Sequence, residues 1–264
     1  MPFTSRAGVR LHWEFDGIPD GIRLVLLNSI GTDIGLWDAT MPELRQTFRT
    51  LRIDTRGHGA SDAPDGDYDL AGLAKDVAAI MDDAQFEDAI VAGVSLGGMI
   101  AMQLALDDPG RVSALGLICT AAAMDRDSWS QRVDTVRARG TDAIAEMAVG
   151  RFLSPKFAAE NPEVAKRIRD AIRAQPDAGY AGAGAAIRDM ELLDRLGEII
   201  APTLVVVGRR DISTPFEGHG DLLARRIPEA RTVHLDSAHL PPLEAPVALA
   251  LTIIEFTQEI RKSE

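Results

Sequence analysis

The stretch "AGVSLGGMI", residues 92–100, places a serine between two glycines where two residue patterns meet. A run of apolar, β-branched residues before it is typical of a buried strand, and the apolar spacing after it is helical. A serine on so sharp a strand-to-helix turn must adopt a strained backbone, and its neighbours must be glycine because larger side chains would collide with nearby backbone. The stretch therefore predicts either an ordinary turn or an exposed nucleophile at Ser95.

Short apolar runs alternate with helical patterns through most of the chain. The runs are unbroken, as in parallel strands covered on both faces. This alternation predicts an α/β fold with a mostly parallel, doubly wound sheet and right-handed crossovers. The expected strands are residues 23–28, 49–54, 88–94, 113–119, 203–208 and 231–235, and the clearest helical patterns are residues 70–84 and 98–109.

The alternation stops between about Met124 and Leu196, where no strand-like run occurs. Helical patches fill this segment, with prolines at positions 155, 162 and 176 as boundaries. We expect a helical cap, or lid, formed by residues 124–196 and inserted before the strand that precedes Asp211. It should lie over one edge of a core formed by residues 1–123 and 197–264, and its Ala/Gly-rich part, residues 178–189, should be a tightly packed helix.

The charge and cysteine content exclude several classes of partner. A formal net charge of −12 over 264 residues disfavours nucleic acid and anionic membranes, so a small-molecule partner is expected. Cys119 is the only cysteine, and the chain starts without the apolar stretch of a signal peptide. We therefore expect a cytoplasmic protein, with the oligomeric state open between monomer and homodimer.

A nucleophilic role for Ser95 requires a base and an acid, because a serine hydroxyl alone is a weak nucleophile. After a G-x-S-x-G turn, the acid and the histidine follow in that order, each at the carboxyl end of a later strand. Asp211 follows the run 203–208, and His239 follows the run 231–235. Asp211 taken alone fits equally well as the N-cap of the next helix. Of the other histidines, His12 and His234 lie in strand-like runs, His58 lies in a turn, and His219 lies at the start of a helix.

A serine nucleophile also needs backbone N–H groups that stabilise the oxyanion. The amide of Leu96 would lie at a helix N-terminus, where the helix dipole favours negative charge. The second donor should come from the loop "NSIGTD", residues 28–33, and Ile30 is the candidate. The sequence has neither a metal-ligand cluster nor a phosphate-loop or dinucleotide fingerprint, so we expect no metal and no cofactor.

Together these motifs resemble the α/β-hydrolase superfamily. The motifs are "GVSLGG" at 93–98, "DTRGHGAS" at 54–61, "GRRDISTP" at 208–215 and "SAHLPPLEAP" at 237–246. The resemblance implies the α/β-hydrolase fold and hydrolysis of carboxylic esters through an acyl-enzyme on Ser95, with Asp211 and His239. Serine at position 95 separates the chain from haloalkane dehalogenase and epoxide hydrolase relatives, which carry an aspartate nucleophile there.

Within the superfamily, the chain is most similar to 3-oxoadipate enol-lactonases of aromatic-compound catabolism. The likeness begins with "NSIGTDIGLWD" at 28–38 and continues into the predicted lid at 120–129, 151–168 and 179–193. Gly35 and Phe152 depart from it, because we expect those lactonases to carry histidine and tryptophan at these two positions. Both departures bear on which lactone is bound.

Four residues are predicted to bind the substrate of such a lactonase. Trp37 and Trp129 would form apolar walls, and Arg151 or Arg188 would pair with a substrate carboxylate. Either tryptophan could instead be packed in the core, and either arginine could lie on a solvated face of the lid. The alternative functions are a broad carboxylesterase or perhydrolase, a carbon–carbon bond hydrolase, and a non-catalytic ligand receptor of the same fold.

Overall fold

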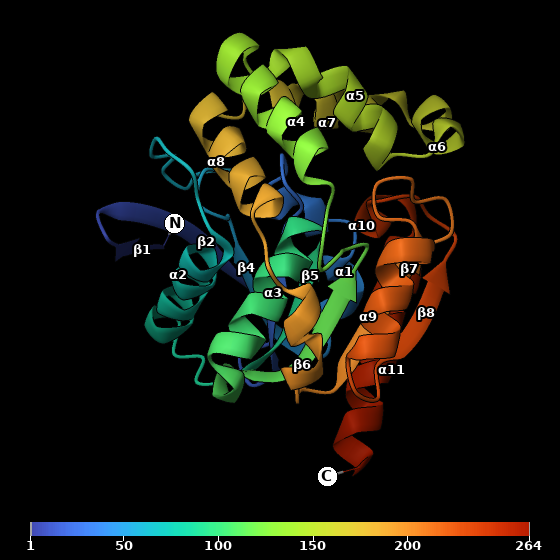
Figure 1. Cartoon of the computed structure of the whole chain (residues 1–264). Helices are drawn as coiled ribbons and strands as arrows, with labels where there is room; N and C mark the ends of the chain where they lie inside the picture. The colour runs from blue at the N-terminus through green and yellow to red at the C-terminus, as the bar shows by residue number, and fades with distance from the viewer. Residues whose placement is uncertain (1, 264) are drawn as a thin grey trace.

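An eight-stranded sheet runs through the centre of the computed structural model, which describes residues 2–263 (Figure 1). The strand order is β1-β2-β4-β3-β5-β6-β7-β8, and β3 to β8 are parallel. The strands are β1 (Phe3–Arg6), β2 (Val9–Gly17), β3 (Ile22–Leu27), β4 (Phe48–Ile53), β5 (Ala89–Val94), β6 (Val112–Ile118), β7 (Thr203–Gly208) and β8 (Arg231–Leu235). The predicted α/β fold is confirmed, and every predicted strand is present within one residue of its expected bounds.

The sheet also contains an antiparallel edge that the apolar runs do not reveal. β1 pairs with β2, and β2 pairs with β4, both antiparallel. The sequence of β2, "VRLHWEFDG", mixes charged and apolar residues, and its second half alternates between partly buried and exposed positions. β1 is the edge strand, and β2 lies between β1 and β4. An antiparallel strand with one solvated face has this mixed pattern rather than an unbroken apolar run.

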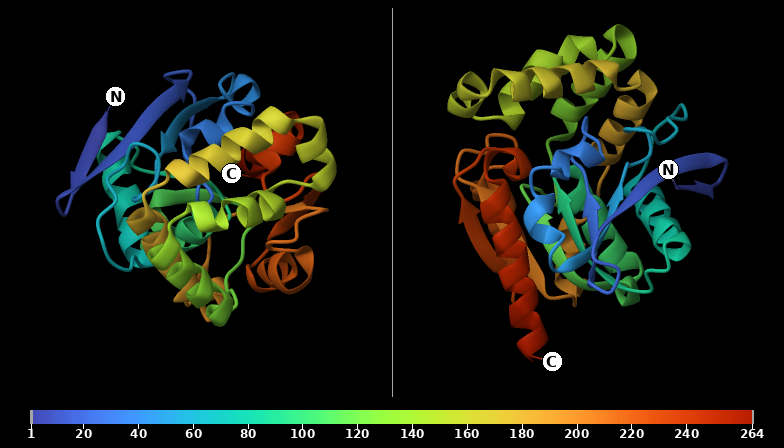
Figure 2. Two further views of the ribbon diagram at one scale, coloured as in Figure 1. Left: turned by 90° about the horizontal axis from the view of Figure 1, so that it is seen from above. Right: turned by 180° about the vertical axis from the view of Figure 1, so that it is seen from behind.

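Helices cover both faces of the sheet. One face is covered by α2 (Leu70–Asp83) and α3 (Leu96–Asp107), which pack against each other (Figure 1). The other face is covered by α1 (Met41–Leu44) and α11 (Pro246–Ser263) (Figure 2). Among residues 2–263, no helix combines the length and the apolar character needed to cross a bilayer.

Five helices between β6 and β7 lie over the carboxyl ends of the parallel strands (Figures 1 and 2). These helices, called the lid helices below, are α4 (Arg126–Arg139), α5 (Asp142–Phe152), α6 (Pro155–Glu160), α7 (Pro162–Ala174) and α8 (Asp177–Arg188). The Ala/Gly-rich segment forms α8, as expected, and packs against α4. A Cβ atom on Gly184 would lie 3.0 Å from Val133, so this packing requires a very small residue.

One buried histidine, His58, should make the free energy of unfolding depend on pH. His58 is 1% exposed, its Nδ1 lies 3.2 Å from the carbonyl oxygen of Arg56, and its Nε2 has no hydrogen-bond partner among residues 2–263. Burial lowers the pKa of His58 from 6.5 to about 4. The folded protein therefore keeps this imidazole neutral at pH values where the unfolded chain protonates it.

We expect the free energy of unfolding to decrease as the pH falls from about 6.5 to about 4, because only the unfolded state then gains the His58 proton. The depressed pKa corresponds to at most about 3 kcal/mol. Urea unfolding at a series of pH values should show this slope in wild type and a shallower slope in His58→Gln. The control is His234→Gln on β8. Equal slopes in wild type and His58→Gln would contradict the prediction.

Candidate active site

Ser95 lies at the turn between β5 and α3 with φ 54° and ψ −115°. Positive φ is costly for a residue with a Cβ atom, so the surrounding structure must hold it in place. The Ser95 amide donates to the carbonyl oxygen of Ile118, and the hydroxyl of Thr120 donates to the carbonyl oxygen of Ser95. A Cβ atom on Gly93 would lie 2.2 Å from the backbone of Gly97, so the glycines are required by the close approach that the sequence suggested.

Asp211 follows β7 and accepts four hydrogen bonds. The amides of Ser213 and Thr214 donate to Oδ1 at 2.7 and 3.2 Å, the hydroxyl of Thr214 donates to Oδ2 at 2.8 Å, and Nδ1 of His239 lies 2.9 Å from Oδ2. Burial alone would raise the pKa of Asp211, but His239 and these donors outweigh it and lower the pKa to about 2. The structure corrects the capping interpretation, because Pro215, not Asp211, is the N-cap of the next helical turn, Phe216–Gly220. Oδ1 of Asp211 instead accepts from the amides of its own loop, and Oδ2 faces His239.

His239 lies on the loop between β8 and the short helix α10 (Pro241–Glu244). Its ring is 2% exposed and stacks on the ring of Phe152, with centroids 5.6 Å apart and an interplanar angle of 22°. Because Nδ1 faces Asp211, Nε2 is the nitrogen left to take up a proton. The lid therefore contacts the imidazole directly through Phe152, the position where the family resemblance led us to expect tryptophan.

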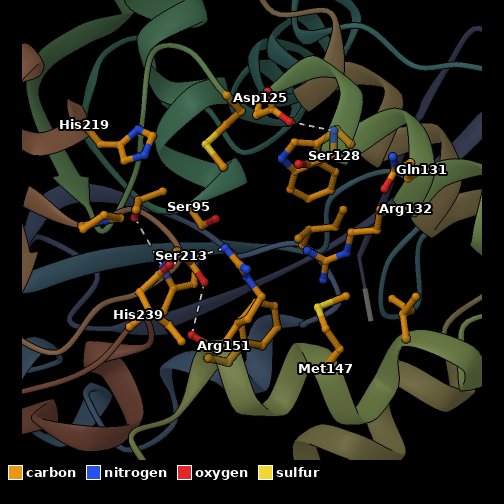
Figure 3. A pocket seen from close by; sticks show the side chains of 18 of the residues that line it. Ser95, Asp125, Ser128, Gln131, Arg132, Met147, Arg151, Ser213, His219 and His239 are labelled. Atoms are coloured by element: carbon orange, nitrogen blue, oxygen red, sulfur yellow. Dashed lines mark hydrogen bonds between the residues drawn. The ribbon is translucent and has the colours of Figure 1, made fainter. Parts of the chain in front are cut away.

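A cavity of about 550 Å³ lies between the lid helices and the carboxyl end of the sheet. Ser95 and His239 both line it, at the end nearest the sheet (Figure 3). His219, from the turn Phe216–Gly220, also lines it, and burial lowers the pKa of this second histidine. A strained serine and an aspartate-bound imidazole thus line the same cavity.

The two predicted oxyanion donors lie beside this cavity. Leu96 directly follows Ser95 and is the first residue of α3, so its amide belongs to the unpaired N–H groups of a helix N-terminus. Ile30 lines the cavity from the loop after β3. Neither amide donates a hydrogen bond to another residue of the described chain, 2–263. Both are therefore free to donate to a bound oxygen atom.

Only two of the four predicted substrate-binding residues reach the cavity. Trp129 and Arg151 line it. Trp37 is fully buried elsewhere, where its Nε1 donates to Oδ1 of Asn28 at 3.0 Å. Arg188 is bound by Asp67 and by Asp189, whose carboxylates lie 2.8 and 2.5 Å from Nη2. The structure therefore corrects the roles predicted for Trp37 and Arg188, because core packing encloses one side chain and two carboxylates hold the other.

Arg132 is a cavity residue that the sequence reasoning missed. Its guanidinium carbon lies 4.8 Å from the ring centroid of Trp129 and 5.5 Å from that of Tyr180. Its Nε and Nη2 are buried without a hydrogen-bond partner among residues 2–263. A signal was available in the sequence, because residues three apart on a helix share a face and Trp129 was already a candidate.

More cationic than anionic side chains line the cavity. Figure 3 shows Arg132 and Arg151 directed into it from α4 and α5. Neither guanidinium has a carboxylate partner in the described chain, and Nη2 of Arg151 donates to the carbonyl oxygen of Ile212 at 3.4 Å. Asp125 is the one acidic lining residue of this cavity, and it caps α4 by accepting from the amide of Ser128 at 2.8 Å. Hydrogen bonds from the side chain and the amide of Ser128 lower the pKa of Asp125. Two arginines without a carboxylate partner therefore face one engaged carboxylate, although the whole chain carries a net charge of −12.

Comparison with known proteins agrees with this geometry. The family model of the alpha/beta hydrolase fold matches residues 22–246. The 3-oxoadipate enol-lactonase 2 of Acinetobacter baylyi is 30% identical over 241 residues, which are 91% of this chain and 90% of the relative.

Two solved structures are similar over nearly the whole chain. The enol-lactonase from Burkholderia xenovorans is 33% identical with a TM-score of 0.94, covering 97% of this chain and 100% of that one. A thermophilic esterase from Thermogutta terrifontis, described with malate bound, is 29% identical with a TM-score of 0.90, covering 98% and 97%. The relatives thus include both a lactonase and an esterase.

Proposed function

Since this chain belongs to the α/β-hydrolase fold family, we propose that it is a serine hydrolase of carboxylic esters and lactones whose substrate is a small enol-lactone bearing a carboxylate. The observation that carries the proposal is the hydrogen bond between Asp211 and His239 beside a strained Ser95, all at one cavity. The similarity to enol-lactonases supports the lactone, and two cavity arginines without a carboxylate partner support the carboxylate.

The proposed reaction is a two-step acyl transfer. The hydroxyl oxygen of Ser95 attacks the lactone carbonyl while Nε2 of His239 takes its proton, and Asp211 holds the imidazole through Nδ1. The amides of Ile30 and Leu96 stabilise the oxyanion. His239 then protonates the leaving oxygen, which in an enol-lactone stays tethered as an enol and can become a ketone. Water activated by His239 releases the acyl group from Ser95.

Arg132 is the proposed partner of the substrate carboxylate, with Arg151 beside it. Trp129 and Tyr180 flank the guanidinium of Arg132, so it is partly desolvated and gains most from a carboxylate. The similar esterase from Thermogutta terrifontis is described with malate, a dicarboxylate, bound.

The test is a substrate panel on purified protein: an enol-lactone with a carboxymethyl group, the same ring with a methyl group, p-nitrophenyl acetate and a vinylogous diketone. We expect the highest kcat/KM for the carboxymethyl lactone. In Arg132→Gln, the ratio of kcat/KM for the carboxymethyl lactone to that for the methyl lactone should fall by roughly 10- to 100-fold, because a hydrogen bond to a charged group contributes about 1.5–3 kcal/mol.

Arg188→Gln is the matched control, because that arginine lies on the lid outside the cavity, and its ratio should equal that of wild type. A wild type that hydrolyses p-nitrophenyl acetate faster than either lactone would favour a broad esterase. Turnover of the diketone alone would favour a carbon–carbon bond hydrolase. An unchanged ratio in Arg132→Gln would remove Arg132 from substrate recognition.

A further inference from the structure

Glu244 is a buried carboxylate that joins three separate segments near the cavity. It is the last residue of α10, and its side chain is 1% exposed. The amide of Ser154 donates to Oε1 at 2.6 Å, and the hydroxyl of Ser154 donates to Oε2 at 3.0 Å. The amide of Ala238 donates to Oε2 at 3.2 Å, and Nη2 of Arg210 lies 3.5 Å from the same oxygen.

Two of these donor residues are next to a residue of the proposed reaction, and the third lies near a ring that stacks on His239. Ala238 precedes His239, and Arg210 precedes Asp211. Ser154 lies between α5 and α6 of the lid, two residues after Phe152, whose ring stacks on His239. One carboxylate therefore holds the lid junction, the loop of the acid and the loop of the base together.

Such a carboxylate is difficult to replace. A buried charge is stable only when its oxygens are satisfied, and here both oxygens of Glu244 accept from donors that would otherwise be buried without a partner. Glutamine at position 244 keeps the shape of the side chain, but its NH₂ group is a donor and cannot accept a hydrogen bond from the donors that face one of the two oxygens. Loss of the carboxylate should therefore release the lid junction and the His239 loop at the same time.

We propose that Glu244 is a positioning residue that clamps the lid junction at Ser154 to the loops of Asp211 and His239, so that seating of the lid and orientation of the imidazole depend on one side chain. This inference rests on the proposed function for its kinetic consequences, but the clamp itself can be tested without turnover. Glu244 acts through Ala238, Arg210 and Ser154 and does not line the cavity.

The carboxylate of Glu244 gives a readout that mere support would not affect. The other groups around the clamp are Arg210, which also pairs with Asp236, the Asp211–His239 pair, and Cys119, whose thiol donates to the carbonyl oxygen of Ala238. Burial raises the pKa of Cys119. Aspartate at position 244 keeps a carboxylate and glutamine does not, so recovery in Glu244→Asp separates a carboxylate clamp from general packing.

The experiment compares Glu244→Gln, Glu244→Asp and Ser154→Ala with wild type. Glu255→Gln is the matched control, because Glu255 is an exposed glutamate on α11. Hydrogen–deuterium exchange of each folded variant should show faster exchange at residues 153–157 and 237–240 in Glu244→Gln. In Ser154→Ala only the lid segment should exchange faster.

We expect kcat of Glu244→Gln to fall about 10- to 100-fold, as for a misplaced reacting group, with partial recovery in Glu244→Asp.

The kcat of Ser154→Ala, which keeps the carboxylate of Glu244, should fall less than that of Glu244→Gln. Unchanged exchange at both segments in Glu244→Gln would overturn the clamp, whatever the activity. If that variant fails to fold, unchanged exchange at the lid junction in Ser154→Ala overturns it instead. A wild type inactive on the whole substrate panel contradicts the proposed function, yet the exchange result still decides the clamp.

Discussion

Ser95→Ala removes the attacking oxygen, and we expect its kcat on the carboxymethyl lactone and on p-nitrophenyl acetate to fall by a factor of roughly 10³ to 10⁶. The remaining rate reflects binding and the oxyanion donors, which act on a water molecule in place of the serine. The fold should be retained, because alanine fits the same space and the backbone of residue 95 keeps its two hydrogen bonds. Its amide donates to the carbonyl oxygen of Ile118, and its carbonyl oxygen accepts from the hydroxyl of Thr120.

A fluorophosphonate probe separates an enzyme from a ligand receptor of the same fold. Wild type should be labelled covalently, and Ser95→Ala should not. Ser130→Ala, a serine on α4 that donates to the carbonyl oxygen of Arg126, is the control and should be labelled as fast as wild type. Folded wild-type protein that resists the probe would contradict the nucleophile and support the receptor.

Asp211→Asn should lower kcat by about 10⁴-fold while leaving the backbone in place. An asparagine amide presents a donor to Nδ1 of His239 and so favours the tautomer with its proton on Nε2, which cannot act as the base. The change also weakens the acceptor for the amides of Ser213 and Thr214. Steady-state kinetics from pH 5 to 9 should show the loss at every pH, because the pKa of Asp211 is about 2 and the carboxylate is ionised throughout.

The same carboxylate contributes to stability in a defined pH range. Its pKa in the folded protein, about 2, is lower than the ordinary value of 3.8, so the contribution is complete above about pH 4 and is lost as the pH falls through about 2. Asp211→Asn should lack this acid-dependent part, whereas the exposed Asp194→Asn should keep it. An Asp211→Asn variant with more than a tenth of wild-type kcat would contradict the role given to Asp211.

Much of the fold was predictable because its determinants are local in the sequence. A parallel strand buried on both faces is an unbroken apolar run, and every such run became a strand. The antiparallel pairing of β1, β2 and β4 was not predicted. The sequence placed His12 in a strand-like run, but one side of β2 is solvated and its mixed pattern gave neither its bounds nor its pairing. The helices between β6 and β7 were predictable because their signals are local: apolar residues at helical spacing and prolines at helix starts.

The sequence by itself determined the strained turn at Ser95, the order of serine, aspartate and histidine, and their places after the parallel strands β5, β7 and β8. These features follow from the residue types at a turn and from a sheet that brings the carboxyl ends of its strands together.

Only the tertiary structure decided which of several similar side chains face the cavity. Trp129 lines it while Trp37 is enclosed in the core, and Arg132 is unpaired while Arg188 is held by two carboxylates. Glu244 looked like any other acidic residue near the end of the chain until Ser154, 90 positions away in sequence, was placed against it. The burial of a side chain and its pairing with a charged partner depend on segments that are distant in the chain, so the local spacing of residues does not indicate them.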